Sequence, residues 1–258
     1  MSNVYVFFAL LWRDLKEIKS RLVGNFIDNI FLLTTSLLVF GSFLPLMGMS
    51  STLIAPLFIG NIILIVFELG YTFSIKIVND VKFDRFIDYH FSLPLSSTWL
   101  LVEYITKFVI EVAIITLPIL VLGIFLLGNK FIIVHTNWFA FGIMYMLMLI
   151  FFATLFLYYS FAYSYEWFFS CIWTRRLDPL FLFGCVFLVW KKLYAFSRPI
   201  GIAFLFNPVT YMAEGIRATL IGGDGFLPIW ACMLGVTIGI VINWLLLVPA
   251  MRKKLDHI

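Results

Sequence analysis

Residues 99–127 read WLLVEYITKFVIEVAIITLPILVLGIFLL, a run long enough to cross the roughly 30 Å hydrocarbon core of a bilayer as one helix. The whole chain of 258 residues is 63% hydrophobic and only 12% charged, whereas soluble domains carry about 25% charged residues. Its 30 phenylalanines and eight tryptophans are too many for one water-soluble core of this size. The composition therefore predicts an all-α, polytopic membrane protein.

Working outward from this run, we expect six transmembrane helices in a single domain that covers residues 1–258. They are placed at 26–47, 52–77, 99–127, 138–163, 178–196 and 227–250. The fifth has a short apolar run, PLFLFGCVFLVW, of 12 residues before Lys191 and Lys192. Twelve helical residues rise only about 18 Å, so this helix has to continue past the two lysines, whose side chains would snorkel to an interface.

Two further segments are expected to be helical without crossing the membrane. Residues 4–22 alternate apolar and charged positions at helical spacing, which predicts an amphipathic helix lying in the membrane interface. Its apolar face would hold Phe8, Leu11, Leu15, Ile18 and Leu22, and its polar face Arg13, Asp14, Lys16, Glu17, Lys19 and Arg21. Residues 197–223 are apolar but broken by proline and glycine, which favours a re-entrant helical segment before the last span.

The basic residues predict the orientation. With both termini on one side, that side receives twelve lysines and arginines, whereas the other receives five and Lys107 lies within a span. Basic residues are enriched in cytoplasmic loops, so both termini and the connection 78–94 are placed in the cytoplasm. The protein is expected in the bacterial inner membrane, and we expect no signal peptide ahead of the first hydrophobic run.

The connection between the second and third spans, VKFDRFIDYHFSLPLSS at 81–97, carries an unusual share of the charges. On a helix its aromatic and aliphatic residues fall together, its charged residues face elsewhere, and Pro94 ends the helix. Two interpretations stay open at this point. The segment is either a solvated turn, or a helix that docks into a groove of a cytoplasmic partner.

Two stretches bring a family resemblance that covers essentially the whole chain. KFDRFIDYHFSLPLSSTWLLVEYITKFV at 82–109 and NPVTYMAEGIRATLIGG at 207–223 resemble the permease subunit of type-2 ATP-binding-cassette exporters. The LP-L-S and NP-x-T-Y-x-x-E-x-x-R pieces are the most specific. One departure is NDVKFDRF at 79–86, where many relatives carry an acidic and glycine pattern.

The resemblance implies an exporter of an amphipathic or lipid-linked substrate, with a permease homodimer and two copies of a separate ATPase subunit. The coupling helix would contact the ATPase through Lys82, Phe83, Asp84, Arg85, Phe86, Ile87, Asp88 and Tyr89. The segment around 207–217 would form an outer gate. The sequence has no GxxxxGK[ST] motif, so we expect ATP and Mg²⁺ on the partner and no enzyme activity in this chain.

Several polar residues are candidates for the translocation route or gate. They are Glu68 and Tyr71 in the second span, Glu103, Lys107 and Glu111 in the third, and Asn207, Pro208, Tyr211, Glu214 and Arg217 before the last. Each set also has a structural interpretation. The Glu103–Lys107–Glu111 stripe would be a self-neutralising ladder packed on another helix, and Glu214 with Arg217 would brace the re-entrant segment through an i,i+3 pair.

Other functions remain open. An ion-coupled secondary transporter would use Glu68 or the stripe as a proton relay, and a membrane assembly protein or receptor would transport nothing. The three histidines show no metal-ligand spacing, so no metal site is expected. Cys171, Cys185 and Cys232 show no CxxC spacing and are expected to be buried structural residues. The net charge of +4 reflects topology, and no nucleic-acid partner is expected.

Overall fold

The computed structural model describes residues 3–39, 43, 46, 53–84, 96–127 and 136–255, and within these ranges it contains helices and no strand. The longer helices are α1 (Asn3–Leu38), α3 (Ile54–Asn79), α5 (Ser97–Leu127), α6 (Trp138–Ala162), α11 (Pro208–Leu220) and α12 (Ile229–Leu255). The shorter ones are α7 (Tyr165–Ile172), α8 (Asp178–Leu182), α9 (Trp190–Phe196) and α10 (Arg198–Phe204), with π-helical turns η3 (Asp80–Asp84) and η5 (Trp173–Leu177). The predicted all-α class is confirmed.

Four of the described helices are long and apolar enough to cross a membrane. They correspond to the second, third, fourth and sixth predicted spans and cover Ile54–Asp84, Ser97–Phe125, Trp138–Ala162 and Ile229–Lys254. They fit a multi-pass membrane protein. The first predicted span, 26–47, begins within α1 and ends among residues only partly described. A total of six spans stays a prediction.

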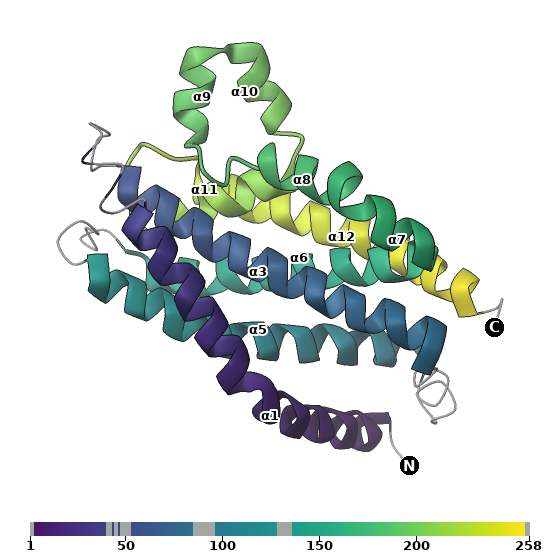
Figure 1. Cartoon of the computed structure of the whole chain (residues 1–258). Coiled ribbons are helices and arrows are strands. Elements are labelled where there is room, and N and C mark those ends of the chain that lie inside the picture. The colour runs from purple at the N-terminus through teal and green to yellow at the C-terminus, as the bar shows by residue number, and fades with distance from the viewer. Residues whose placement is uncertain are drawn as a thin grey trace.

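Of the four candidate spans, whose arrangement Figure 1 shows, α3 and α6 are the most buried and α12 is the least. Rings of α3 and α6 interlock at the centre, with the Phe67 centroid 5.9 Å from Phe152 and 5.5 Å from Phe156. Nearer the Lys82 end, the small side chains of Ser74 and Ser160 let α3 and α6 come close, and their Oγ atoms lie 2.7 Å apart. In a bilayer the hydrophobic effect does not bring helices together, because lipid tails are as apolar as the side chains. Close packing and hydrogen bonds between helices take its place.

The helix α1 differs from the predicted interface helix in two respects. It continues without interruption through residue 22 to Leu38, and Figure 1 shows it bending along its length. Its buried face holds Phe7, Leu10, Asp14 and Ile18, while Phe8 is exposed. The predicted apolar face is therefore correct at Ile18 and wrong at Phe8, while Leu11 and Leu15 are half-buried. The burial of Asp14 was not expected, and its physical reason is the ion pair with Lys107 on α5.

The fifth predicted span, 178–196, is not one helix. The helix α8 ends at Leu182, residues 183–189 leave the helical path, and α9 begins at Trp190. The helical run instead begins earlier and passes through α7, η5 and α8 in succession over 165–182. The π-helical turn ends at Leu177, two residues before Pro179, which has no N–H to continue a regular α-helical ladder. This run carries Glu166, Arg175, Arg176 and Asp178, which lower its hydropathy and hide it from a search by apolar length.

The segment predicted to be re-entrant contains short helices, as its prolines and glycines indicate. The helices α9 and α10 form a hairpin that projects from the bundle, whereas α11 lies against it (Figure 1). Residues of α11 are mostly buried, and the backbone N–H of Asn137 donates to the carbonyl of Thr219 at 3.0 Å, which joins the end of α11 to the start of α6. A re-entrant path through a membrane stays a prediction.

The two ends of the bundle are named here after Ile54 and Lys82, which lie at opposite ends of α3 and η3. The Ile54 end holds the first residues of α3, α6 and α12 together with α11. The Lys82 end holds η3, the start of α7 and the last residues of α12, where Lys254 Nζ donates to the carbonyl of Tyr163 at 2.8 Å.

Candidate functional site

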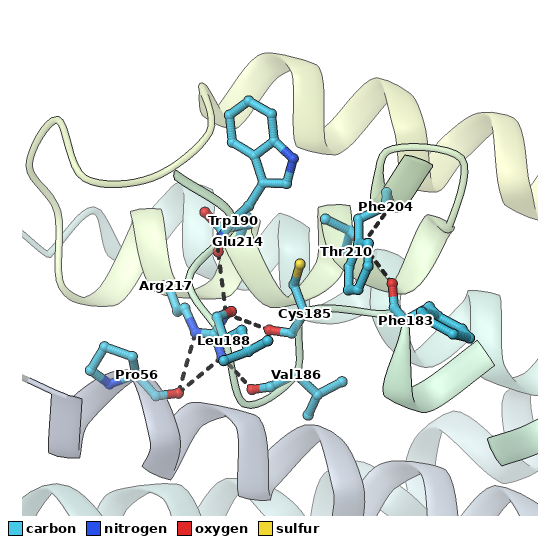
Figure 2. A network of polar contacts seen from close by, with 10 residues as sticks. All are labelled: Pro56, Phe183, Cys185, Val186, Leu188, Trp190, Phe204, Thr210, Glu214 and Arg217. Atoms are coloured by element: carbon cyan, nitrogen blue, oxygen red, sulfur yellow. Dashed lines mark hydrogen bonds and ion pairs between the residues drawn. The ribbon is translucent and has the colours of Figure 1, made fainter. Parts of the chain in front are cut away.

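A buried arginine on α11 lies at the centre of a polar network at the Ile54 end (Figure 2). Arg217 is fully buried, and its Nη1 donates to the carbonyl oxygens of Cys185 and Leu188 at 2.8 Å each. Its Nε and Nη2 both donate to the carbonyl of Pro56 at 3.2 Å, and Nη2 also donates to the carbonyl of Val186. One side chain thereby joins α3, α11 and the 183–189 segment.

The 183–189 segment explains why an arginine is needed there. Its residues form no helix, so their carbonyl groups lack the partners that a helix would supply, and buried carbonyls require donors. An arginine offers five N–H donors in a rigid fork. Cys185 adopts a φ of 52°, a left-handed conformation that turns the chain and brings neighbouring carbonyls toward the guanidinium.

Glu214 supplies the counter-charge. Its Oε1 accepts from Arg217 Nη1 at 3.2 Å and from the backbone N–H of Trp190 at 3.0 Å. Oε2 has no hydrogen-bond partner among the described residues. The predicted i,i+3 ion pair is present, and it is fully buried. Glu214 also fixes the first residue of α9, so the pair connects the projecting hairpin to α11.

The start of α11 is held in the same region. Asn207 Oδ1 accepts from the backbone N–H of Val209 at 2.9 Å, which is an N-cap, and Pro208 occupies the first turn. Asn207 Nδ2 donates to the carbonyl of Leu180 at 2.6 Å and ties α11 to α8. Tyr211 lies elsewhere, half-buried with its ring close to Gly235 of α12. The gate candidates therefore all belong to α11 or its N-cap, but they do not form a single site.

A second polar region is a groove between α1, α3 and α5. It consists of two adjoining cavities of about 410 and 430 Å³ that share Phe73, Lys76 and Glu111 in their linings. Charged residues that line the first include Arg13, Glu17, Asp80 and Lys107, and acids that line the second include Asp28 and Glu68. The groove brings Glu68 together with two members of the predicted stripe.

The stripe on α5 is paired across the groove rather than along its own helix. Lys107 Nζ lies 3.2 Å from Asp14 Oδ2 and 3.5 Å from Glu17 Oε2 on α1. Lys76 Nζ on α3 lies 3.7 Å from Glu111 Oε1. The stripe residues do pack on other helices, but their partners are on α1 and α3. The charges therefore hold three helices around the two cavities.

Two carboxyl groups meet at the α1–α5 contact. Asp14 and Glu103 are each 1% exposed, and Arg13 donates to Asp14 Oδ1 at 2.8 and 2.9 Å. Neither carboxyl oxygen of Glu103 has a hydrogen-bond partner among the described residues. Burial tends to raise the pKa of Asp14, but the interaction with Glu103 and the charges of Lys107 and Arg13 outweigh it and lower that pKa.

The structure separates residues that the sequence placed side by side. Glu68 lines the groove, whereas the Tyr71 ring stacks on Phe168 and meets the Trp173 edge of the 165–182 run. On the predicted interface helix, Arg13 and Glu17 line the groove and Lys16 Nζ lies 5.7 Å from the Trp12 ring. The side chain of Arg21 lies outside the described part of the structure.

The predicted coupling segment is described over its first residues, and Asp84 is exposed there. Lys82 forms an ion pair with Glu166 of α7 and lies 4.3 Å from the Tyr165 ring centroid, which the Phe83 ring meets edge-on at 5.2 Å. The hydrogen bond from Lys82 lowers the pKa of Glu166 below its usual value. Positions that fall outside the described residues are Arg85, Phe86, Ile87, Asp88 and Tyr89.

Sequence reasoning missed three features of these regions. Asp14 looked like a solvated charge, the 183–189 segment looked like part of a helix, and the arginines of η5 looked like residues of a loop. Gly60 was an available signal for the second feature. A Cβ placed there would lie 2.1 Å from the carbonyl oxygen of Val186, so only glycine lets the segment approach α3 this closely.

Metal chemistry has no candidate in the part of the chain that is described, since no group of three or more histidine, cysteine or acidic residues gathers there. The cysteines are free thiols, with Cys185 and Cys232 buried and Cys171 half-buried. No family model, no characterised protein and no solved structure matches this chain.

Proposed function

We propose that the chain is the transmembrane subunit of an ATP-binding-cassette exporter, which moves an amphipathic or lipid-linked substrate out of the cytoplasm. A separate ATPase subunit would supply the energy, and two copies of this chain would pair. The proposal rests on the resemblance of residues 82–109 and 207–223 to such permeases, and on the way one helix connects those two stretches.

That helix is α3, and its two ends carry the proposal. Its last turn leads into Lys82 and Phe83, where the predicted coupling segment begins, and its first turn contains Pro56, whose carbonyl accepts from Arg217. The helix has 26 residues and spans about 39 Å. Most of it is buried, so it moves as a rigid element. A displacement applied at the Lys82 end therefore reaches the Arg217 network without an intermediate hinge.

The proposed cycle uses this connection. ATP binding closes the two partner ATPases and displaces the coupling segment at the Lys82 end. The ion pair between Lys82 and Glu166 carries the displacement to α7 as well, so α3 and the 165–182 run move together. At the Ile54 end, the same movement shifts the 183–189 segment and α11 through the Arg217 contacts. The chain itself performs no covalent chemistry in this cycle.

The test is co-purification from native membranes followed by an ATPase assay. We expect a P-loop ATPase to accompany the wild-type chain and to be lost, or to hydrolyse ATP without coupling, in the Phe83→Ala/Phe86→Ala double variant. Phe139→Ala is the matched control, because Phe139 is 80% exposed at the Ile54 end and should leave the partner bound. A chain that purifies from native membranes without any P-loop protein contradicts the proposal.

One observation favours a second candidate function. The buried carboxyl pair of Asp14 and Glu103 beside the charged groove is the arrangement that an ion-coupled transporter would use to carry a proton. That function predicts substrate flux in vesicles driven by a proton gradient alone, abolished in Glu103→Gln. Flux that requires ATP and persists without the gradient excludes it.

A further inference from the structure

The hairpin of α9 and α10 carries basic charge only. Residues 190–206 contain three basic residues and no acidic residue. The hairpin is closed on itself, because Trp190 Nε1 donates to the carbonyl of Gly201 at 2.8 Å and the Trp190 ring stacks on Tyr194. It is therefore a self-contained basic element that projects from the bundle (Figure 1).

The outer surface of this hairpin is largely apolar. Phe196 is 85% exposed and Phe206 is 86% exposed, and Ile200 and Ile202 are also exposed. Exposed aromatic side chains next to basic ones are typical of elements that lie among lipid headgroups. The candidate spans α3, α6 and α12 all begin at the Ile54 end, which the hairpin adjoins. Both the position and the side chains of the hairpin therefore fit the headgroup level of one leaflet.

An apolar groove lies between the hairpin and the first turn of α3. It consists of two adjoining cavities of about 300 and 370 Å³ that share Leu53, Pro56, Val189 and Lys192 in their linings. The other lining residues are Leu57, Phe187, Leu188, Leu193 and Phe196 in the first cavity, and Lys191, Ala195, Gly225 and Phe226 in the second. Apart from the two lysines, these residues are apolar. We call this the α3–α9 groove.

The Arg217 network fixes the walls of the α3–α9 groove. Arg217 donates to the carbonyls of Pro56 on α3 and Leu188 in the 183–189 segment, and both of these residues line the groove. A buried side chain therefore sets the position of one wall relative to the other. All the lining residues belong to the Ile54 end, so an occupant would lie within one leaflet and would not reach the Lys82 end.

The lysines at the α3–α9 groove keep their charge without a counter-charge. Lys192 lines both cavities and is exposed, and it forms no ion pair with a carboxylate of the described residues. Lys191 donates to the backbone carbonyl of Asp224, which has no net charge. An ammonium group at the edge of an apolar groove favours an anion beside it, while the groove itself favours a hydrocarbon chain.

We propose that the α3–α9 groove binds an anionic phospholipid of the surrounding bilayer as a resident ligand, with its phosphate beside Lys192 and one acyl chain in the groove. Basic pockets between membrane helices recognise such headgroups. A soluble anion would leave the apolar lining unfilled, and a lipid of zero net charge would leave the lysines uncompensated. The site goes beyond the proposed function, because the lipid is held at one end of the bundle and is not exported.

Photo-labelling of the full chain tests the site. The chain is purified in a neutral detergent and exposed to phosphatidylglycerol that carries a diazirine in one acyl chain. We expect the label on peptides that contain Leu57 or Phe196. Unlabelled phosphatidylglycerol should displace it at a lower concentration than phosphatidylcholine with the same chains. Equal displacement by the two lipids would indicate ordinary bilayer contact and overturn the proposal. Displacement by inorganic phosphate at the same concentration as phosphatidylglycerol would also overturn it, because the acyl chain would then contribute nothing.

The variant Lys192→Gln tests the headgroup contact. One lysine near an anionic headgroup contributes a factor of about five in affinity, so the concentration of phosphatidylglycerol that displaces half of the label should rise about fivefold. The value for phosphatidylcholine should not change. Arg198→Gln is the matched control, since Arg198 is exposed on the same hairpin and lines neither cavity. A Lys192→Gln chain that keeps the wild-type preference for phosphatidylglycerol contradicts the proposal.

The variant Ala195→Trp tests the acyl-chain contact. Ala195 is exposed and lines the second cavity, so an indole ring there would occupy the groove without entering the core. We expect the label on the Leu57 and Phe196 peptides to disappear, and the melting temperature in lipid-free detergent to stay close to that of the wild type. Undiminished labelling of a folded Ala195→Trp chain overturns the proposal. If this variant does not fold, the result with Lys192→Gln decides.

A second copy of the chain is the competing occupant of the groove. Chemical crosslinks between two copies through Lys192, in place of the lipid label, would assign the groove to the second copy and overturn the proposal. None of these measurements needs an ATPase. Co-purification of a P-loop partner decides the exporter proposal separately, so either proposal can fail while the other stands.

Discussion

The Arg217 network and the α1–α3–α5 groove use charge in opposite ways. Around Arg217 the donors of one guanidinium are all engaged, the ion pair is fully buried, and the contacts converge on one point. In the groove the charges are spread over three helices and surround two cavities, and ion pairs there are as long as 3.7 Å. Glu103 has no protein donor of the described residues.

The charges of the two regions therefore have different roles. Those around Arg217 fix the backbone, whereas those of the groove can change partners. A buried charge with every partner in place fixes the backbone around it, and removing it leaves several groups unsatisfied at once. In the groove, Lys76 and Glu17 are half-exposed, and charges of that kind can exchange partners at little cost. The first region is therefore expected to control folding, and the second to tolerate changes in charge while the helices rearrange.

The largest expected effect is on the first region. Arg217→Met leaves carbonyls of α3 and of the 183–189 segment, together with the Glu214 carboxylate, without their donor. Breaking a buried pair in this way costs about 3–5 kcal/mol. We expect thermal unfolding in detergent to show this loss. Arg217→Lys should recover only part of it, because an ammonium group cannot reach all the acceptors. A variant as stable as the wild type would show that the network does not brace the fold.

The next effect concerns how closely the 183–189 segment approaches α3. Gly60→Ala places a methyl group 2.1 Å from the Val186 carbonyl oxygen, and overpacking of this kind costs about 1–3 kcal/mol. Gly142→Ala on α6 is the matched control, since nothing lies within 4 Å of its Cβ position. There alanine should stabilise the helix slightly. Equal stability changes in the two variants would show that the 183–189 segment does not approach α3 at Gly60.

A smaller effect is expected in the groove. Lys107→Gln removes the cation beside Asp14 and Glu17, but Arg13 still donates to Asp14, so the loss of unfolding free energy should be about 1–2 kcal/mol. Lys76→Gln should cost less because its pair with Glu111 is longer and more exposed. If Lys107→Gln lowers the unfolding free energy as much as Arg217→Met does, the proposed difference between the two regions is wrong.

The smallest effect lies at the Lys82 end, where the pair with Glu166 is exposed. Glu166→Gln should leave the melting temperature within error of the wild type, since exposed pairs contribute little. The pKa of Glu166 is lowered in the folded chain, so any contribution is present at neutral pH and is lost as the pH falls through that lowered pKa. A melting difference between Glu166→Gln and wild type at pH 7 that persists below the lowered pKa of Glu166 would contradict this assignment.

The sequence predicted the fold class and four of the spans because apolar length alone decides them. It failed at the fifth because four charged residues lie on the helical run 165–182, and at 183–189 because a buried arginine far along the chain satisfies its carbonyls. No local pattern reports a partner that lies about thirty residues away or more. The burial of Asp14 on α1 was missed for the same reason, since its partner Lys107 is on α5.

The candidate site was predicted to a similar extent. The i,i+3 pair of Glu214 and Arg217 follows from short spacing, and it is present. The partners of the α5 stripe could not be predicted, because they depend on which helices pack on α5. The separation of Glu68 from Tyr71 also follows from packing, since residues three apart on α3 contact different neighbours.

The charged run 165–182 has a consequence for how the protein is made. On insertion scales each arginine near a helix centre adds about 2.5–3.5 kcal/mol, so two of them offset the gain from most of the apolar residues in so short a segment. We therefore expect that this run does not enter a bilayer by itself. It would need α3, which is synthesised before it and whose Phe67 contacts Trp173 and Phe181. The half of the chain after residue 163 should then not insert correctly when it is expressed alone.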